Sequence, residues 1–341
     1  ERGIIMTKKW KKAIALSLAA LTLTGALAGC GDDKKAASGA AKPAAGQTIK
    51  INFPTAGASG ALYAVGAAIT NMWSSQVPGV QASSQASAGG IANLNMVSEG
   101  EAQVSIAISS NVYQCLNGTD SFKDHAYKDL KAIGGLYLNP NQVVATANSG
   151  INSLKDVKGK HFAVASAGSS VYNECETHFT AAGLSFPDDI KAEYITFTDA
   201  ADMLQNGSID GAWIMSGAPA SAVTQALTGG AHLVEIDDGL IKELKAKYPW
   251  YTSYTIKAGT YPNQDKDVKT SAIKMVMFCR GDLPEDVVYQ LTKTLWEHMD
   301  ELGQSQKNLK GLTAENAVKD IADIPLHPGA AKYYKEIGVL K

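Results

Sequence analysis

Small and hydroxyl-bearing residues gather in five short segments, each after an apolar stretch and before a helical pattern. The first, TAGASGALYAVG over residues 55–66, holds three glycines, a serine and a tyrosine. The other four are residues 84–94, 109–113, 166–174 and 216–222. Helix starts offer free backbone N–H groups that favour anions. In an open sheet the strand ends meet at one edge, so the five segments predict one shared binding cleft.

The residues for phosphate-loop or nucleophilic chemistry do not occur in their usual spacing. Gly57, Gly60 and Gly66 do not form G-x-G-x-x-G, and no Gly-Lys-Ser/Thr follows them. None of the six histidines stands in a nucleophile-elbow or H-E-x-x-H pattern. These patterns favour a binding protein over an enzyme, and no cofactor or metal is expected.

Charged residues near the five segments give no clear acid–base pair. The pairs 188–189 and 237–238 are both Asp-Asp in polar turns, which we interpret as solvated loop faces. Arg280 is the only arginine after the first 29 residues, and we interpret it as structural. An acidic ligand would therefore depend on backbone N–H groups, hydroxyls and a lysine rather than on a bidentate arginine. The aromatic candidates, each equally compatible with core packing, are Tyr63, Tyr113, Tyr172 and Trp213.

The elements that must position these segments alternate along the chain. We predict strands over residues 49–53, 102–109, 130–138, 142–148, 161–168, 192–197, 210–217 and 231–237. Helical spacing of apolar residues predicts helices over residues 62–76, 91–97, 175–182, 200–205 and 220–227. Alternation of this kind is typical of parallel sheets covered by helices on both faces.

The N-terminus has the pattern of a secretory signal peptide. Four lysines precede an apolar stretch over residues 13–28, which ends in Leu27-Ala28-Gly29-Cys30. This ending resembles the bacterial lipobox, which implies cleavage before Cys30 and lipidation of its thiol. The apolar stretch is shorter than the roughly 20 residues that a spanning helix needs. Residues 31–47 are small and polar and are expected to form a flexible tether.

The remaining composition excludes some classes of function. Five of the 31 basic residues and one of the 33 acidic residues lie in residues 1–29, which leaves a net charge of −6. That charge argues against nucleic-acid binding. Three further cysteines, Cys115, Cys175 and Cys279, show no metal-binding or redox spacing, so we expect buried free thiols rather than one disulfide.

Residues 51–341 resemble the solute-binding proteins of tripartite ATP-independent periplasmic (TRAP) transporters, specifically the TAXI subgroup. The shared stretches are TAGASGALYAVG, ASAGGIANL with SEGEAQ, DGAWIMSGAPASAV with ALTGG, AGTYPNQDKDVKT and IPLHPGAAKYYKEIGVL. The resemblance implies an α/β fold, the two-domain periplasmic binding protein type II (venus flytrap). It places domain 1 at residues 48–140 and 255–341, and domain 2 at residues 141–254.

The resemblance also implies the site residues. The expected ligand-binding residues are Gly57, Ser59, Gly60, Tyr63, Ser87, Gly89, Gly90, Asn93, Ser109, Ser110, Asn111, Gly168, Ser169, Ser170, Tyr172, Ser216 and Gly217. The chain departs from the family pattern at residues 87–90, 109–111 and 168–171, which leaves the ligand's hydrogen bonds open. Pro219 and His327 are interpreted as helix-start residues.

The function implied is an extracytoplasmic receptor, lipid-anchored through Cys30, that captures a small carboxylate. The expected ligands are an amino acid such as glutamate or glutamine, or a dicarboxylate such as 2-oxoglutarate. The expected partners are the TRAP membrane permease subunits, with the receptor a monomer. A secreted enzyme, or a sensory or adhesive surface lipoprotein that uses the same cleft, remains an alternative, because a fold does not fix a function.

Overall fold

A computed structural model of the chain describes residues 48–57 and 60–341. The expected signal peptide, Cys30 and the tether lie outside the described residues, as does the candidate ligand residue Ser59. Within the described part of the chain, no helix combines the length and the apolar character needed to cross a membrane.

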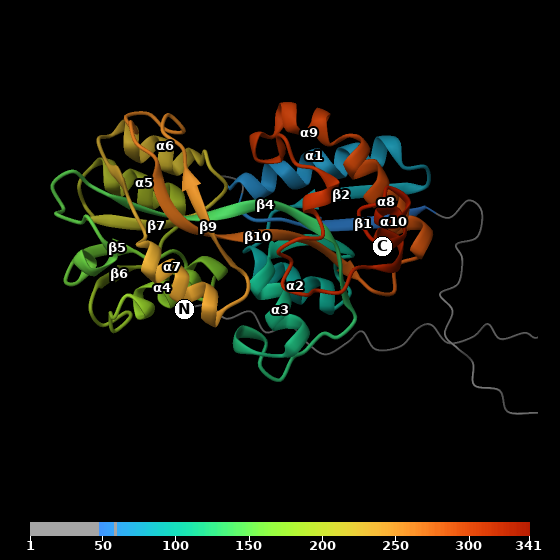
Figure 1. The fold of residues 1–341 in the computed structure, drawn as a ribbon, viewed down its shortest axis with the longest axis horizontal. Helices are drawn as coiled ribbons and strands as arrows, with labels where there is room; N and C mark the ends of the chain where they lie inside the picture. The colour runs from blue at the N-terminus through green and yellow to red at the C-terminus, as the bar shows by residue number, and fades with distance from the viewer. Residues whose placement is uncertain (1–47, 58–59) are drawn as a thin grey trace, which may run out of the picture. The chain divides into compact units, whose positions relative to one another are not determined.

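The described residues form two lobes, which lie side by side in Figure 1. The first lobe contains the N-terminal strands and helices, the C-terminal helices and one half of each of two long strands. Its elements are β1 (Ile49–Pro54), α1 (Ala61–Gln76), β2 (Val80–Gln85), α2 (Gly90–Ser98), β3 (Val104–Ile108), α3 (Ser109–Asn117), η1 (Asp120–Phe122), α8 (Glu285–Glu297), α9 (Met299–Ser305), η3 (Lys307–Leu309), η4 (Ala314–Asn316) and α10 (Pro328–Glu336).

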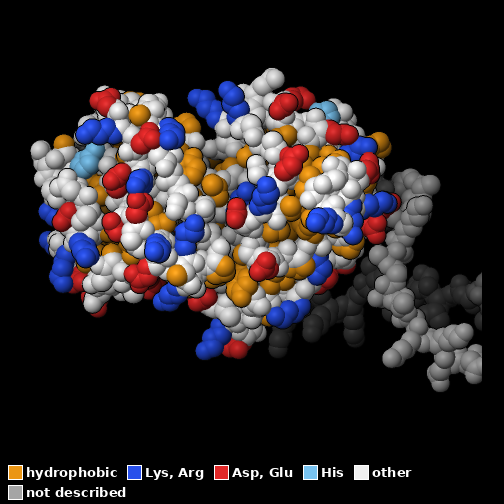
Figure 2. Space-filling model, in the orientation of Figure 1, with side chains coloured by type: hydrophobic (Ala, Val, Ile, Leu, Met, Phe, Trp, Pro, Cys, Tyr) orange, Lys and Arg blue, Asp and Glu red, His pale blue; other side chains and the backbone are white. Residues whose placement is uncertain are grey.

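The second lobe is built from the middle of the chain. Its elements are η2 (Leu154–Val157), β5 (His161–Ala163), α4 (Ser170–Ala181), β6 (Lys191–Glu193), α5 (Phe197–Gln205), β7 (Gly211–Met215), α6 (Ser221–Thr228), β8 (His232–Val234), α7 (Asp238–Lys247) and β9 (Tyr251–Ile256). Lys/Arg and Asp/Glu side chains are interspersed over the face of both lobes that Figure 2 shows.

Two long antiparallel strands, β4 (Leu130–Ala145) and β10 (Val268–Arg280), join the lobes (Figure 1). In the first lobe β10 pairs with β3 and β4, and in the second lobe it pairs with β9. The far half of β4 pairs with β7 and β8. The two strands are hydrogen-bonded to each other where they cross, so any movement of one lobe must be accommodated there.

The prediction of parallel sheets is wrong for most strand pairs. Only β1–β2, β5–β6 and β5–β7 are parallel. The two crossing strands lie next to each other in the eight-stranded sheet and run in opposite directions. Each also runs antiparallel to its other neighbours, which are β3 and β9 for β10 and β7 and β8 for β4. The alternation of strands and helices identifies a layered α/β fold but does not reveal these two strands.

The two strands predicted at residues 130–138 and 142–148 are one strand, β4. The residues between the two predicted strands include Asn139 and Asn141, which are buried in the strand. Asn141 donates a 3.0 Å hydrogen bond from Nδ2 to Oγ of Ser271 on β10, and the hydroxyl of Thr270 donates to the carbonyl oxygen of Asn141. These bonds replace water, so the strand continues through the polar residues.

Several helices begin earlier than predicted. The segment at residues 109–113 was expected to be a loop, but Ser109 is the first residue of α3. Helix α4 begins at Ser170 rather than at residue 175, and α5 begins at Phe197. The hydroxyl groups of the caps Ser169 and Thr196 accept backbone N–H groups of α4 and α5, which explains both starts.

Apolar side chains form a core in each lobe. In α1 the residues Leu62, Val65, Ile69 and Met72 are all buried, as their spacing predicts. In the second lobe Trp213 is buried beside Phe179 and is a core residue rather than a ligand contact. Cys115, Cys175 and Cys279 are buried free thiols, which confirms that prediction.

The domain limits stay a proposal. The chain first passes from one lobe to the other within β4, and there we retain residue 140, in the middle of that strand, as the limit. For the second passage we propose residues 268–273 rather than residue 255, because Ile256, Tyr261 and Val268 pack with the core of the second lobe.

Candidate functional site

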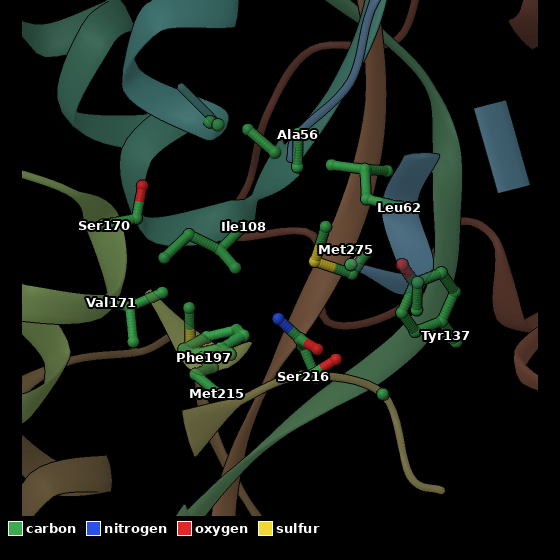
Figure 3. A pocket seen from close by; sticks show the side chains of 17 residues that line it. Ala56, Leu62, Ile108, Tyr137, Ser170, Val171, Phe197, Met215, Ser216 and Met275 are labelled. Atoms are coloured by element: carbon green, nitrogen blue, oxygen red, sulfur yellow. The ribbon is translucent and has the colours of Figure 1, made fainter. Parts of the chain in front are cut away.

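A cavity of about 120 Å³ lies where the two lobes meet. Its walls come from the starts of α1, α2, α4 and α5, from the ends of β3 and β7, and from the crossing strands β4 and β10. Figure 3 shows Ser170 and Tyr137 on opposite sides of it, with Ile108 and Met275 between them. The wall therefore combines helix starts and strand ends, as the sequence predicted for a shared cleft, with the middles of β4 and β10.

Helix starts supply the backbone donors of this cavity. The wall contains Gly60, Ala61 and Leu62 of α1, Gly89 and Gly90 of α2, and Ser170 and Val171 of α4. None of these three helices has an acidic residue in its first turn, and neither Gly60 nor Gly89, the N-caps of α1 and α2, provides a side-chain cap. Their positive dipole ends and free N–H groups therefore make the surrounding space favourable for an anion.

The lobes contact each other on both sides of the cavity. A Cβ atom at Gly90 would lie 3.2 Å from Oγ of Ser170 and 3.2 Å from Cβ of Ala107. A Cβ atom at Gly217 would lie 2.5 Å from Oδ1 of Asn308. A side chain at residue 90 would therefore press on Ser170 and Ala107, and one at residue 217 would displace the Asn308 side chain.

The hydroxyl of Ser170 has no hydrogen-bond partner among the described residues. The residue is only 9% exposed and lies in the cavity wall. Its neighbour Ser169 differs, because the Ser169 hydroxyl accepts the Tyr172 N–H at 3.2 Å and caps α4. A buried polar group without a partner costs about 1–3 kcal/mol, so Ser170 is suited to a partner outside the described chain.

Two polar residues in the wall were missed by the sequence analysis. Tyr137 and Asn139 of β4 both line the cavity, since residues two apart in a strand share a face. They are 6% and 8% exposed, and no side-chain hydrogen bond joins either to another described residue. Burial raises the pKa of Tyr137, so its phenol is neutral. Unpaired polar residues inside a buried strand were the available signal.

The rest of the wall is apolar. Ile108, Leu62, Val171, Phe197, Met215 and Met275 contribute side chains, and Ser216 and Gly217 follow β7. No Lys, Arg, His, Asp or Glu occurs among the described residues of the wall. A ligand here would be held by dipoles and hydrogen bonds rather than by an ion pair.

Ser87 and Asn93 support the cavity from behind. Asn93 is fully buried and donates from Nδ2 to the carbonyl oxygens of Thr55 and Ile106, at 2.7 and 3.3 Å. The hydroxyl of Ser87 lies 2.6 Å from Oδ1 of Asn93 and accepts the Gly89 N–H at 3.0 Å. Their side chains thus hold the end of β1 and the start of α2 together rather than lining the cavity.

The predicted site residues divide into two groups. Six line the cavity: Gly60, Gly89, Gly90, Ser170, Ser216 and Gly217. The other described candidates do not line it: Gly57, Tyr63, Ser87, Asn93, Ser109, Ser110, Asn111, Gly168, Ser169 and Tyr172. Tyr63 is exposed, and Tyr172 packs against Phe186 and Tyr194 in the second lobe.

A buried polar cluster lies one helical turn beyond Ser170. Burial raises the pKa of Glu174 to about 8, although the hydrogen bond that it accepts from the Tyr251 hydroxyl opposes this shift. Burial also lowers the pKa of His178 to about 4, and its Nε2 lies 2.7 Å from Oγ of Ser271 on β10. Both groups are neutral at pH 7. His178 attaches α4 to the crossing strand β10, and Glu174 attaches α4 to β9 through Tyr251.

Other expectations concerned residues outside this cavity. Arg280 forms an ion pair with Asp282, as expected for a structural residue. Asp237 caps α7, and His327 caps α10 through its Nδ1, which confirms its interpretation as a helix-start residue. Pro219 lies one residue before the cap of α6, at a cis peptide bond.

Comparison with known proteins places the chain in a family. A model of the NMT1-like family matches residues 53–338. The chain belongs to the NMT1-like family. The match covers both lobes of this NMT1-like protein and all the described wall residues of the cavity.

Solved structures show the same fold. The periplasmic binding protein BugD has 15% sequence identity and a TM-score of 0.51, with 86% of this chain and 98% of that chain covered. A structure described as a periplasmic transporter has 16% identity and a TM-score of 0.50, with 86% and 93% covered. The alkanesulfonate-binding protein SsuA from Xanthomonas axonopodis pv. citri, bound to MOPS, has 16% identity, a TM-score of 0.49 and 85% of each chain covered. The NMT1-like chain has the two-domain α/β fold of periplasmic binding proteins.

Proposed function

We propose that this NMT1-like protein is an extracytoplasmic solute receptor of a transporter and binds a small carboxylate in the cavity between its lobes. The observation that carries the proposal is the meeting of four helix starts at one cavity, three of which, those of α1, α2 and α4, have no acidic residue in the first turn. A carboxylate would accept the free N–H groups there and interact favourably with the three dipoles.

Contacts between the lobes support a closing mechanism. Gly90 and Ser170 belong to different lobes and meet at the cavity, so a ligand held between α2 and α4 contacts both lobes at once. Such a ligand binds the closed arrangement better than an open one, and it shifts the population toward closure. The crossing strands β4 and β10 are the segments that would bend.

The finer points of the proposal come from the sequence. We propose a TRAP-type permease as the membrane partner, a lipid on Cys30 as the anchor, and a monomeric receptor. Glutamate, glutamine and 2-oxoglutarate are the ligands that the TAXI resemblance suggests. These three compounds are therefore the first to be tested for binding.

A thermal-shift screen of residues 31–341 tests the proposal. Amino acids, monocarboxylates and dicarboxylates are added singly, and a ligand at 100 times its Kd should add roughly 2.7 kcal/mol to the stability. We expect at least one carboxylate to raise the Tm and to be recovered chemically unchanged. Consumption of the compound would instead indicate an enzyme, and no response to any carboxylate would contradict the proposed ligand class.

A pair of variants identifies the cavity as the place of binding. In Gly90→Val the new side chain would enter the contact between Gly90 and Ser170, so the Tm rise should disappear. Asn95→Val also introduces a valine, but on the exposed side of the same helix, and this variant should retain the rise in Tm. Equal responses of the two variants would place the ligand elsewhere.

A further inference from the structure

We propose that the cavity selects a carboxylate whose second polar group is uncharged, with Tyr137 and Asn139 of β4 as the specificity-determining residues. This inference rests on the proposed function and names the ligand class for the same cavity. The second group would be an oxo, hydroxyl or amide group, separated from the carboxylate by a short apolar stretch.

The anionic end of the ligand would lie at the helix starts. Gly90 of α2 and Ser170 of α4 meet there, and the Ser170 hydroxyl is buried with no partner among the described residues. A hydroxyl in this position donates to a carboxylate oxygen, and the N–H groups of the first turns add further donors. This side of the cavity is therefore complementary to one negative charge.

The other end has hydrogen-bonding groups but no charge. The Tyr137 ring stands on the opposite side of the cavity from Ser170 (Figure 3). Tyr137 offers one neutral O–H donor, and the Asn139 amide offers donors and an acceptor. Neither forms a side-chain hydrogen bond with another described residue. A polar but uncharged ligand group would satisfy both.

The middle of the cavity separates the two ends with apolar side chains. Ile108 and Met275 lie between Ser170 and Tyr137 in Figure 3. Val171, Phe197 and Met215 complete this part of the wall. A hydrocarbon stretch of the ligand would pack here, and a charged group would lose its hydration without compensation.

Charge on the second group is disfavoured because no described residue of the wall is charged. Lys274 precedes the wall residue Met275 but belongs to the opposite face of β10, where its Cε is 2.7 Å from the Cβ position of Gly135. A second carboxylate would therefore lack a cation. Asp199 follows the wall residue Phe197 by two residues, and its Oδ2 accepts the Thr196 hydroxyl at 2.6 Å. Neither Asp199 nor Glu174 is part of the wall, so an ammonium group would lack an anion there.

A matched ligand series tests this inference with the folded chain. The Kd of residues 31–341 is measured by calorimetry for pentanoate, 4-oxopentanoate, glutarate, 5-aminopentanoate and L-glutamate, with four- and six-carbon analogues alongside. We expect 4-oxopentanoate, or its analogue of another length, to bind about ten-fold more tightly than the unsubstituted acid. Glutarate, L-glutamate and the amino acid with a terminal ammonium should bind more weakly than the oxo acid.

Three variants then test the two residues. Asn139→Leu should reduce the ten-fold preference for the oxo acid to about one, and Tyr137→Phe should reduce it about three-fold without changing the shape of the side chain. Asn95→Leu, which alters an exposed asparagine of α2, should keep the full preference. An unchanged preference in both cavity variants would overturn the assignment of Tyr137 and Asn139.

The outcomes separate the inference from the proposed function. Tighter binding of glutarate or L-glutamate than of the oxo acid would overturn the inference and leave the carboxylate receptor in place. No binding of any carboxylate would overturn both.

Discussion

The Tyr251 hydroxyl donates a 2.7 Å hydrogen bond to Oε2 of Glu174, and both side chains are buried between α4 and β9. The carboxyl group is kept protonated at neutral pH because burial raises its pKa to about 8, from an ordinary value of 4.5. His178, one turn further along α4, is kept neutral by a pKa lowered to about 4. Stability must therefore depend on pH through both groups.

The two groups act in opposite directions below pH 6.5. The folded state retains a proton on Glu174 that the unfolded chain loses, so this residue makes stability fall with rising pH from about 4.5 to about 8. His178 makes stability rise from about pH 4 to 6.5. From these two groups we expect a nearly flat profile up to pH 6.5. Between pH 6.5 and 8 we expect a fall, with a slope of at most about 1.4 kcal/mol per pH unit. Urea unfolding at fixed pH values measures it.

Glu174→Gln is the matched variant for this profile. Glutamine keeps an oxygen that accepts from Tyr251 but has no proton to lose, so the fall above pH 6.5 should vanish. The rise from His178 below pH 6.5 should then become visible. A fall of the same slope in the glutamine variant would assign the titration to another group.

The Ser170 hydroxyl should favour binding but not folding. It is buried without a partner among the described residues, so Ser170→Ala should not lower the free energy of unfolding and should raise it by at most about 1–3 kcal/mol. Binding of 4-oxopentanoate should weaken about ten-fold. Calorimetry of this variant is compared with Thr180→Ala, which removes an exposed hydroxyl from the same helix. Equal affinities would show that Ser170 does not contact the ligand.

Asn93 should be essential for the geometry of the first lobe. In Asn93→Asp, a carboxylate oxygen would face the carbonyl oxygens of Thr55 and Ile106, where Nδ2 now donates. We expect a loss of about 2–4 kcal/mol in the free energy of unfolding, together with weaker binding. Denaturant unfolding measures the first effect. A stability within 0.5 kcal/mol of the original chain would contradict the role given to this side chain.

Gly134 should tolerate no side chain. A Cβ atom there would lie 2.3 Å from the Tyr334 hydroxyl, which donates to the Ile133 carbonyl oxygen at 2.9 Å and accepts from Trp296 Nε1 at 2.8 Å. Gly134→Ala should cost roughly 1–3 kcal/mol. Gly57→Ala, where a Cβ atom meets nothing within 4 Å, is the stability control. Similar Tm values for the two variants would contradict this expectation.

Local patterns predict the helices and the cavity better than the sheet order. Helix α1 follows from the spacing of Leu62, Val65, Ile69 and Met72, and the glycines at residues 60, 89 and 90 indicate where helix starts meet. The pairing of β10 with β3, β4 and β9 depends on contacts far apart in the sequence, which no local pattern contains.

The missed residues have a common physical origin. Asn139 and Asn141 lie between the two strands that we predicted, and polar residues are disfavoured in a buried sheet. In the structure Asn141 is paired with Ser271, and Asn139 faces the cavity. Conversely, the family resemblance implies that Ser87 and Asn93 are ligand contacts, whereas in the structure their side chains hold the turn together. A glycine-rich turn with a serine and an asparagine has the same composition in both cases.

The three cysteines in the described part of the chain are buried and should react poorly with thiol reagents. Burial raises the pKa of Cys115 to about 11, and it raises the pKa of Cys175 and Cys279 as well. The thiolate is the reactive form, so maleimide dyes at pH 7 should leave all three unlabelled. In a chain that begins after Cys30, one new cysteine on the surface of each lobe would then carry a donor and an acceptor fluorophore without background. Energy transfer between them would test directly whether the two lobes move toward each other when a carboxylate is added.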